Sequence, residues 1–596
     1  MSLIVQKFGG TSVADVEKIR AAARKAIRAH TQGHQVVTVV SAMGKNTDRL
    51  VELAYELNER PPAREMDVLL STGEQVTVAL MAMAIESLGY KAVSLTGAQM
   101  GIRTDNTFTK ARIQSIDTQR IQGYLDAGNI VIAAGFQGID DDFNITTLGR
   151  GGSDTTAVAL AAVLGADTCE IYTDVDGVYT TDPRLLPEAR RVEVVSYDEM
   201  LELASLGAGV MHNRSIEFAK KFGVPIHVRS SFSDTTGSMI VAECESESSP
   251  VCGAAMTKNE ARVTILGVPD VPGTSLDIFS RIADRKIAVD MIVQNVGTEG
   301  RADLSFTVPN SELAVTLEAA RDAIEKIGAQ GVSFDENVSK ISVVGLGMAQ
   351  QTGVAHRMFS ALAEAGINIY MITTSEIKIS ALVPRDKAQD ALRVVHNTFK
   401  LDSVAEDARN WSRIQHDRSQ TADLQSVVAT LQDDTLEKLT LTDIALVPDQ
   451  ARITLLGVPD RPGIAADIFA DVGKSGIFVD MIVQGYDGED GTTSVSFTVP
   501  KADYANSRTV AEALCKKFNL RGTEGADDIA KLSVSGIGLR SHTSVGTIMF
   551  RTLAQAGVNI QMINTSELQV NVVIQSDKAA ETERLLRETF AESLRS

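Results

Sequence analysis

Two glycine-rich loops in the N-terminal part of the chain contain residue types that bind phosphate. KFGGTS spans residues 7–12 and LGRGGSDTTA spans 148–157, and a helix-like segment follows each loop. Adjacent glycines let backbone N–H groups approach an anion closely, and the N-terminus of a helix favours negative charge. Lys7 adds a charge that could stabilise a phosphoryl group during transfer. No GxxxxGK[ST] motif occurs, so the predicted site is not of the Walker A type.

Three charged side chains, in the second loop and in the STGE motif at 71–74, could bind a carboxylate or an ammonium group. Arg150 carries a planar guanidinium, which can grip a carboxylate through two parallel hydrogen bonds. Glu74 in STGE and Asp154 in GRGGSD could accept an ammonium group. Both acids also have a structural interpretation, because Ser71 and Glu74 have the spacing of a capping box and Asp154 would suit a helix start.

Other motifs do not indicate a metal or a dinucleotide. VVGLG at 343–347 lacks the glycine spacing of a dinucleotide fingerprint, and TDVDG at 173–177 lacks the glutamate of an EF-hand loop. His212 and His227 have no partner motif, so we interpret both as structural. Cys169, Cys244, Cys252 and Cys515 show neither CxxC spacing nor paired histidines, and we expect no metal ligands in the protein.

Strand-like segments are expected to position the loops. QVVTVVSAM begins at residue 35, NIVIAAGFQ at 129 and TCEIYTDV at 168, and helix-like segments separate them. This alternation predicts an α/β fold with a mainly parallel sheet that is buried on both faces. Ligands of such sheets bind beyond the carboxyl ends of the strands.

The C-terminal half contains an internal duplication. RVTILGVPDVP at 262–272 recurs as RITLLGVPDRP at 452–462, and KISVVGLG at 340–347 recurs as KLSVSGIG at 531–538. Each copy repeats more weakly within itself, as a strand, a Gly-rich turn, an amphipathic helix and further strands. We predict four α+β units of βαββαβ type, each with helices on one face of an antiparallel sheet.

A polar segment separates the two copies. Residues 401–450 contain no glycine, ten acidic residues and four Lys or Arg, which indicates a solvated, partly helical linker. The predicted domains are a catalytic domain at 1–245, a first pair of repeats at 250–400, a linker at 401–440 and a second pair at 441–596.

The charge balance limits the partners. The 596 residues include 57 Lys+Arg and 77 Asp+Glu, a formal charge of −20. This balance argues against nucleic acid or a phospholipid surface as the main partner, because both reward basic patches. There is no cationic leader and no run of about 18 apolar residues. We expect a cytoplasmic protein without a nucleic-acid or membrane partner.

Taken together, the motifs resemble those of the aspartate kinases, the aspartate-specific branch of the amino acid kinase family. The matching segments are KFGGTS at 7–12, VVSAMG at 39–44, STGE at 71–74, GRGGSDTTA at 149–157 and YTDVDGVYTTDPR at 172–184. The resemblance covers residue 1 to about residue 400, and the second copy extends it. The repeats resemble ACT domains, which are regulatory modules for small molecules, and two pairs resemble the four-ACT form of the enzyme.

The resemblance implies ATP-dependent phosphorylation of the side-chain carboxylate of L-aspartate, the first step of lysine, threonine and methionine biosynthesis. Mg²⁺ would accompany ATP and be held mainly by phosphate oxygens. Lys7 and Asp154 would act at the catalytic centre. The implied substrate-binding residues are Ser41, Thr47, Glu74, Arg150, Gly151, Gly152 and Ser153. The implied nucleotide-binding residues are Lys7, Phe8, Gly9, Gly10, Thr173, Asp174, Tyr179, Asp182, Arg184, Gly209 and Val210.

One position departs from the family pattern. Gly209, in SLGAGVMHN at 205–213, stands where many members carry a lysine that helps to stabilise the phosphates. Either Lys7 then carries more of that task, or Lys45 or Arg184 replaces the missing cation.

The resemblance also implies that end-product amino acids, lysine and/or threonine, bind the repeats and inhibit the enzyme. Helix-start amides after each LGVPDxPG loop would bind the effector carboxylate and the loop aspartate its ammonium. The other half of the same copy would supply the facing strand. The loops could also be ordinary turns. The predicted effector-binding residues are Asp270, Pro272, Gly273, Gln294, Asn368, Ile369, Thr374, Ser375, Asp460, Pro462, Gly463, Gln484, Asn559, Ile560, Thr565 and Ser566.

Two other functions stay open from the sequence. An amino acid kinase with another acyl acceptor is one, although STGE and GRGGSD argue against it. A catalytically weak amino-acid sensor is the other, and four ACT-like units together with Gly209 would suit it. We expect a homodimer or a higher homo-oligomer.

Overall fold

In the computed structural model the chain forms two units. The first contains Met1–Tyr179, Arg191–Glu245 and Ala408–Lys438, and the second contains Thr180–Arg190, Ser246–Asp407 and Leu439–Ser596. Most of the predicted linker, including its helix-like segment DLQSVVATLQDD, lies outside the described residues. The structure describes residues 2–207, 210–242, 250–294, 300–351, 353–403, 436–437, 439–486, 491–539 and 544–594.

An eight-stranded sheet forms the centre of the first unit, in the order β12-β14-β13-β9-β1-β2-β6-β3. Its neighbouring strands are parallel except for the pair β13 and β14, which confirms the predicted mainly parallel sheet. Its strands are β1 (Leu3–Phe8), β2 (Gln35–Val40), β3 (Ala92–Leu95), β6 (Ile130–Ala134), β9 (Thr168–Thr173), β12 (Val194–Ser196), β13 (Ile226–Ser230) and β14 (Ser238–Val241).

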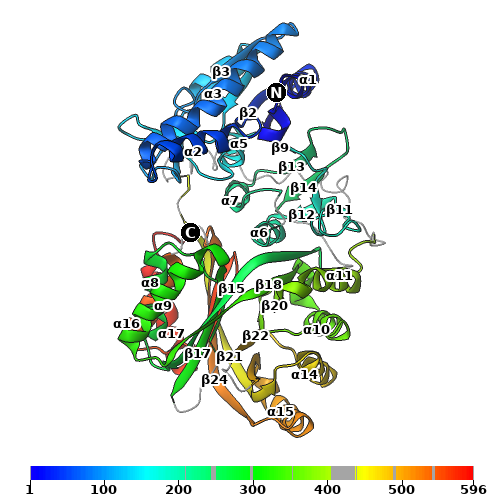
Figure 1. Ribbon diagram of the computed structural model, residues 1–596, viewed down its shortest axis with the longest axis vertical. Coiled ribbons are helices and arrows are strands. Elements are labelled where there is room, and N and C mark those ends of the chain that lie inside the picture. Colours follow the sequence, from blue (N-terminus) through cyan, green and yellow to red (C-terminus); the bar gives the residue numbers. More distant parts are fainter. Residues whose placement is uncertain are drawn as a thin grey trace. The chain divides into compact units, whose positions relative to one another are not determined.

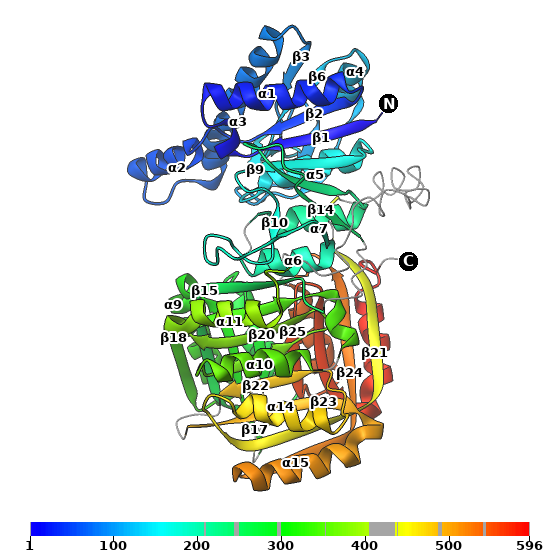
Figure 2. The same cartoon turned by 90° about the vertical axis from the view of Figure 1, so that its right-hand side faces the viewer.

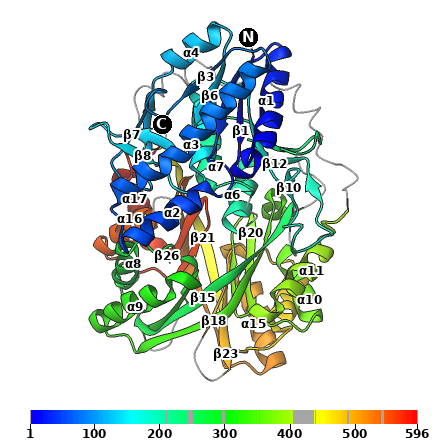
Figure 3. The same ribbon diagram turned by 45° about the horizontal axis from the view of Figure 1, so that its top comes forward.

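Helices cover both faces of this sheet. α1 (Val16–Thr31) and α3 (Ala63–Ser87) run side by side over one face and share a hydrophobic core with β1, β2 and β6 (Figure 3). α5 (Gly152–Val163) contacts β1 and β9. Figure 2 shows α1 and α5 on opposite sides of β1 and β2. The start of α5 therefore approaches the sheet from the face that α1 and α3 leave free.

A second, four-stranded sheet, β5-β4-β7-β8, adds to the first unit, and its strand β8 contacts α3. The short strands β10 and β11 form an antiparallel pair. These and the remaining elements of the unit are β4 (Ile102–Thr104), β5 (Ile113–Ile116), β7 (Gln137–Ile139), β8 (Ile145–Thr147), β10 (Val178–Tyr179), β11 (Arg191–Val192), α2 (Asn46–Leu57), α4 (Gln119–Asp126), α6 (Tyr197–Ser205) and α7 (Asn213–Phe222).

One helix of the first unit has an unusual composition. Among the helices in the described ranges, α3 is the single one that is long and apolar enough to cross a membrane, which the sequence analysis did not expect. Its buried residues include the two acids Asp67 and Glu74. Because α3 packs on the sheet and buries these acids, we interpret it as a core helix.

The second unit contains one twelve-stranded sheet, in the order β16-β17-β15-β18-β20-β19-β22-β23-β21-β24-β26-β25. Its edge strands β16 and β25 contact each other, so the sheet curves back on itself. The first copy contains β15 (Gly253–Pro269), α8 (Thr274–Asp284), β16 (Asp290–Gln294), β17 (Arg301–Pro309), α9 (Leu313–Ile327), β18 (Gly331–Val344), α10 (Val354–Glu364), β19 (Met371–Thr374), β20 (Lys378–Pro384) and α11 (Ala388–Thr398). The second copy contains β21 (Thr440–Pro459), α14 (Ile464–Lys474), β22 (Ile482–Tyr486), β23 (Thr492–Pro500), α15 (Tyr504–Phe518), β24 (Gly522–Ile537), α16 (Ser544–Gln555), β25 (Met562–Thr565), β26 (Gln569–Gln575) and α17 (Ala579–Thr589).

The helices of this unit form two layers that each combine both copies (Figure 1). α8, α9, α16 and α17 share one hydrophobic core, and α10, α11, α14 and α15 share the other. A third cluster contains Met291, Met371, Met481 and Met562, which occupy corresponding positions in the four repeats. The apolar faces of the helices are therefore buried between the copies as well as within each copy.

The four repeats share long strands. In β15, Gly253–Thr257 pairs with Lys340–Val344, whereas Arg262–Leu266 pairs with Gly331–Asp335. The first segment of β15 therefore completes the second repeat, and its other segment belongs to the first. β21 and β24 are paired in the same way in the second copy. Within each copy, the first repeat is thus inserted in the sequence between two segments of the second repeat.

Candidate active site

Lys7 lies near the end of β1 and points toward α5. Phe8 belongs to the hydrophobic core under α1 and α3, and side chains alternate along a strand, so Lys7 faces the opposite side. Its Nζ lies 2.6 Å from Oδ1 of Asp154, which is in the first turn of α5. The two side chains are only 11% and 12% exposed. A nearly buried ammonium is therefore held by a carboxylate at the carboxyl ends of the parallel strands.

Gly9 and Gly10 shape the loop that follows Lys7. A Cβ at Gly9 would lie 3.5 Å from Lys7 Nζ, so its absence leaves room beside the ammonium. A Cβ at Gly10 would lie 2.9 Å from the carbonyl oxygen of Ala42. Gly44 donates its N–H to the carbonyl of Gly10 at 3.0 Å. The loops after β1 and β2 therefore touch, and a side chain at residue 10 would separate them.

The hydroxyl residues Ser41 and Thr47 follow β2. Ser41 donates its N–H to the carbonyl of Phe8 at 3.1 Å, which holds it beside the end of β1. Thr47 lies in α2, and both residues are half-buried. The structure therefore brings Ser41 next to the phosphate loop and Thr47 to the helix that follows it.

Glu74 reaches the loop after β2 from the middle of α3. Its Oε1 accepts the N–H of Ala42 at 3.0 Å, whereas its buried Oε2 has no hydrogen-bond partner among the described residues. Burial raises the pKa of this carboxyl to about 7. The capping-box interpretation is wrong, because α3 begins at Ala63 and the Ser71 hydroxyl donates to the carbonyl of Val68. Glu74 thus presents an unused acceptor, as an ammonium-binding group would.

Arg150 lies in the turn that leads into α5. The next residue, Gly151, has a φ of 70°, and a Cβ there would lie 2.3 Å from the His212 side chain. A Cβ at Gly152 would lie 2.8 Å from the ring of Phe136. Both glycines are therefore required by close packing. Arg150 itself is exposed, and no ion pair of its guanidinium is found in the part of the chain that the structure describes.

The helix-start interpretation of Asp154 is compatible with its ion pair. Asp154 and Ser153 lie in the first turn of α5, and both are buried. A carboxylate at this place interacts favourably with the helix dipole and also pairs with Lys7. The observed position of the Asp154 carboxylate is therefore consistent with both the structural and the catalytic interpretation.

The predicted nucleotide-binding segment divides between the two units. Thr173 ends β9, its hydroxyl donates to Asp174 at 3.1 Å, and Tyr179 lies in β10. Thr180–Arg190, which contains Asp182, belongs to the second unit. Its Thr180 carbonyl accepts the N–H of Ala254 at 2.7 Å, and its Thr180 hydroxyl lies 3.0 Å from Nε2 of His396 in α11.

Arg184, one of the two predicted replacements for the lysine that is missing at residue 209, pairs with Asp182. Its Nε and Nη2 donate to both carboxylate oxygens of Asp182, at 2.8 to 3.1 Å. These hydrogen bonds hold the pKa of Asp182 below its ordinary value, and the charge of Arg184 is already compensated. Gly209 lies outside the described residues, and Val210 is half-buried just before α7.

Sequence reasoning missed Asp67, which fixes the segments around the Arg150 turn. Asp67 is fully buried on α3, and its carboxylate accepts N–H groups of Thr109 and Thr147 at 2.9 to 3.0 Å and the Thr147 hydroxyl at 2.6 Å. Asp67 and Glu74 stand seven residues apart, a spacing that puts both on one helix face. Two acids on one face of a largely apolar helix were the sequence signal that could have identified Asp67.

The donor set suits a nucleotide phosphate better than a bare metal ion. Gly9 leaves space beside the Lys7 ammonium, and the glycine turn leads into the N-terminus of α5. Within the described ranges, no group of three or more His, Cys, Asp and Glu side chains could hold a metal ion.

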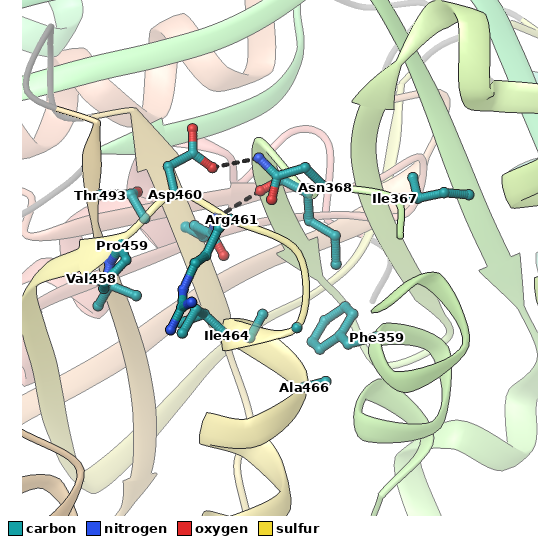
Figure 4. Close-up of a pocket in the computed structure, with 14 residues that line it drawn as sticks. Phe359, Ile367, Asn368, Val458, Pro459, Asp460, Arg461, Ile464, Ala466 and Thr493 are labelled. Carbon is teal, nitrogen blue, oxygen red and sulfur yellow. Dashed lines mark hydrogen bonds between the residues drawn. The ribbon is translucent and has the colours of Figure 1, made fainter. Parts of the chain in front are cut away.

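The second unit contains a cleft between Asp460 and Asn368 (Figure 4). Asn368 Nδ2 donates to Oδ1 of Asp460 at 2.7 Å, and Gln484 Nε2 donates to the carbonyl of Ile369 at 3.0 Å. α14 begins directly after Gly463, so its N-terminus borders the cleft. The cleft volume is about 10 Å³.

The equivalent cleft lies between Asp270 and Asn559. Asn559 Nδ2 donates to Asp270 at 2.7 Å, and Gln294 Nε2 donates to the carbonyl of Ile560 at 3.0 Å. Its volume is about 340 Å³, and Arg452 and Lys578 also line it. The predicted loops and asparagines do meet, but each pair joins opposite copies and not the two halves of one copy. Each loop is followed by a helix start, with Pro272 and Gly273 before α8 and Pro462 and Gly463 before α14.

The TSE segments lie elsewhere. Thr374 and Ser375 line a cavity of about 280 Å³ with Asp480, and Thr565 and Ser566 line one of about 120 Å³ with Asp290. The expectation that they would face the LGVPDxPG loops is wrong, because β19 and β25 place these residues at separate cavities.

Comparisons with known proteins agree with this geometry. The amino acid kinase family profile matches residues 2–230, and the ACT domain profile matches 341–399, 453–518 and 532–590. An aspartokinase of Pseudomonas aeruginosa is 50% identical over 408 residues, which are 68% of this chain and 99% of the relative. One from Helicobacter pylori (strain ATCC 700392 / 26695) is 49% identical over 405 residues, 67% of this chain and 100% of the relative.

Solved structures extend the likeness to the second copy. The crystal structure of aspartate kinase from Synechocystis is 38% identical, covers 99% of this chain and 98% of its own, and has a TM-score of 0.52. E. coli aspartokinase III in complex with aspartate and ADP is 24% identical, covers 67% of this chain and 99% of its own, and has a TM-score of 0.56. At 24% identity, the E. coli structure supports the assignment of the fold and nothing further.

The curated relatives are matched over almost their whole length at about 50% identity. Their length corresponds to the catalytic unit and one copy of the repeats, and the second copy aligns with the Synechocystis structure. The loops, the buried Lys7–Asp154 pair and the ACT repeats all fit this assignment. The chain belongs to the aspartate kinase family and is an aspartate kinase with a duplicated ACT pair.

Proposed function

We propose that the protein transfers the γ-phosphoryl group of ATP to the side-chain carboxylate of L-aspartate, giving 4-phospho-L-aspartate. The observation that carries the proposal is the Lys7 ammonium, which is held at 2.6 Å by Asp154 and lies beside Gly9, where no side chain fills the space. A fixed charge at this place stabilises the transferring phosphoryl group without rearrangement. The attacking carboxylate is ionised at neutral pH, so positioning and charge neutralisation suffice and no general base is needed.

The other residues would orient the substrate. The exposed guanidinium of Arg150 would bind a carboxylate of aspartate, and the unpartnered Oε2 of Glu74 would accept its ammonium. Ser41 and Thr47 would add hydroxyl contacts, and the glycine loops would cradle the phosphates. E. coli aspartokinase III, which has the same fold, forms a complex with aspartate and ADP. Mg²⁺ would be held mainly by the phosphate oxygens of ATP and would neutralise part of their charge.

A trapping assay tests the proposed reaction. The purified protein, Mg²⁺-ATP, L-aspartate and hydroxylamine should yield aspartyl hydroxamate, because hydroxylamine intercepts an acyl phosphate. A signal with glutamate and none with aspartate would indicate a kinase with another acyl acceptor. Absence of ATP turnover with every amino acid, while lysine or threonine still binds, would favour the catalytically weak sensor.

The pKa of Glu74 predicts a pH dependence. Burial raises it to about 7, so below pH 7 the carboxyl is mostly protonated and cannot accept the substrate ammonium. We expect kcat/KM for aspartate to rise as the pH increases through about 7, because this parameter reports ionisation of the free enzyme. Glu74→Gln should lower kcat/KM and remove this rise.

Kinetics from pH 5.5 to 8.5 check the assignment, with kcat/KM for ATP as the internal control. A rise that persists in Glu74→Gln would show that another group titrates and that Glu74 does not bind the ammonium.

We also propose that end-product amino acids regulate this activity through the clefts at Asp270 and Asp460. The aspartates would bind the effector ammonium, and the starts of α8 and α14 its carboxylate. E. coli aspartokinase III also forms a complex with lysine and aspartate, designated the T-state. An effector that binds one conformation more tightly shifts the equilibrium toward it. This would set feedback control on the first step of lysine, threonine and methionine biosynthesis, in the cytoplasm.

The two clefts differ, so the same effector should not fill both equally. The Asp270 cleft has a volume of about 340 Å³ and two lining cations, whereas the Asp460 cleft has about 10 Å³, room for about one water molecule, and must widen to admit an amino acid. Asp270→Ala and Asp460→Ala should each weaken inhibition by about tenfold or more for the amino acid bound at that cleft. Inhibition curves for lysine and threonine, separately and together, measure the effect.

Asp471→Ala is the matched control, since Asp471 lies on α14 and pairs with Lys517 at the surface. If neither cleft variant moves either curve while basal activity is intact, the effectors bind elsewhere.

A further inference from the structure

Arg214, near the start of α7, connects the segments on either side of the Arg150 turn. Its Nη1 donates to the carbonyl of Leu148 and its Nη2 to the carbonyl of Ala111, both at 2.6 Å. Leu148 directly precedes the turn. The residue before it, Thr147, accepts the N–H of Ala111 through its carbonyl at 2.9 Å, which is a second link between the same two segments. A single guanidinium thus joins the turn to the segment that leads into β5.

The turn has little freedom to move independently of these segments. A Cβ at Gly149 would lie 3.0 Å from the carbonyl of Thr109, and one at Gly151 would lie 2.3 Å from the His212 side chain. The turn is therefore seated between the Thr109 segment and the residue that caps α7. A shift of either neighbour would displace Arg150.

The charge of Arg214 is compensated by Glu437, which is distant in sequence. Glu437 Oε2 lies 2.6 Å from Nε and Oε1 lies 2.7 Å from Nη2 of Arg214, a bidentate pair. The side chains are 15% and 7% exposed. Glu437 Oε1 also accepts the N–H of Ile113 at 2.9 Å, and the neighbouring Leu436 is buried and donates its N–H to Gln114 at 3.1 Å.

This arrangement makes the position of the guanidinium depend on Glu437. A nearly buried arginine needs a matching carboxylate, because an unpaired charge at such a place loses solvation without compensation. Without Glu437, Arg214 would gain by turning toward water, and its bonds to Leu148 and Ala111 would be lost or weakened. The turn before α5 would then no longer be held in one conformation by these hydrogen bonds.

We propose that Glu437 is a positioning residue for substrate binding: by neutralising Arg214 it holds the turn Gly149–Gly151 in the conformation that presents Arg150. The segment between the two ACT copies, which ends where β21 begins at Thr440, then contributes to the catalytic unit and is more than a connection. The inference rests on the proposed role of Arg150 in binding the aspartate carboxylate.

Steady-state kinetics of Glu437→Ala and Glu437→Gln test the proposal in the full-length protein. Glu437→Ala should raise KM for aspartate about tenfold or more, with KM for ATP little changed, because a small misplacement of an orienting group is costly. Glu437→Gln should have a smaller effect, since its amide oxygen can still accept from Ile113 and Arg214 but lacks the charge. The double variant Arg214→Gln/Glu437→Gln should be no worse than the poorer single variant, as coupled residues are not additive.

Asp198→Ala is the matched control. Asp198 pairs with Lys220 at the other end of α7, at 2.5 Å, so its loss breaks an ion pair of the same helix without touching the Arg150 turn. It should leave KM for aspartate near that of the unaltered protein. If Glu437→Ala does not fold, Glu437→Gln alone decides the question.

Three results separate the possible failures. An unchanged KM for aspartate in the Glu437 variants, while Arg150→Ala raises it, overturns the positioning role and leaves the proposed function intact. A fall in kcat and thermal stability without a KM change also overturns it, because that is the effect of a structural ion pair. Failure of the unaltered protein to phosphorylate aspartate would contradict the proposed function itself.

Discussion

The ion pair between Lys7 and Asp154 is the constraint on which the catalytic unit depends. A lysine ammonium is costly to bury unless a carboxylate compensates it, and here the compensation requires the end of β1 and the start of α5 to meet. The start of α5 also packs closely against Phe136, since a Cβ at Gly152 would lie 2.8 Å from its ring. The glycine pairs thus serve the packing of the unit as well as the approach of phosphate.

The second unit depends on a different constraint, the burial of repeated apolar faces. Each helix layer covers one hydrophobic core built from both copies, and the clefts at Asp270 and Asp460 lie where these copies meet. The segment Thr180–Arg190 is bonded to this unit through Ala254 and His396, while its flanking strands β10 and β11 belong to the catalytic unit. The segment that carries the predicted nucleotide-binding residue Asp182 is therefore hydrogen-bonded to the repeats.

Local patterns in the sequence sufficed for the parallel sheet, its glycine loops and the four repeats, because apolar runs and turn residues act over short distances. Long-range pairing was not accessible. The two copies are so alike that either could match Asp270 with Asn368 or with Asn559, and only packing selects Asn559. Arg214 and Glu437 likewise carry no local motif and are separated in the sequence by the first copy of the repeats. The misplacement of Thr374 came from assigning the TSE segment to the same facing strand as Asn368, although Thr374 ends β19 and lines another cavity.

The most direct test of the account compares Lys7→Ala with Arg150→Ala in steady-state kinetics. If the Lys7 charge stabilises the transferring phosphoryl group, its loss should lower kcat about a hundredfold, with a small change in KM for aspartate. If Arg150 grips the substrate, its loss should instead raise KM for aspartate about tenfold or more, with a smaller effect on kcat. Equal effects on both parameters in both variants would contradict this division between charge stabilisation and substrate binding.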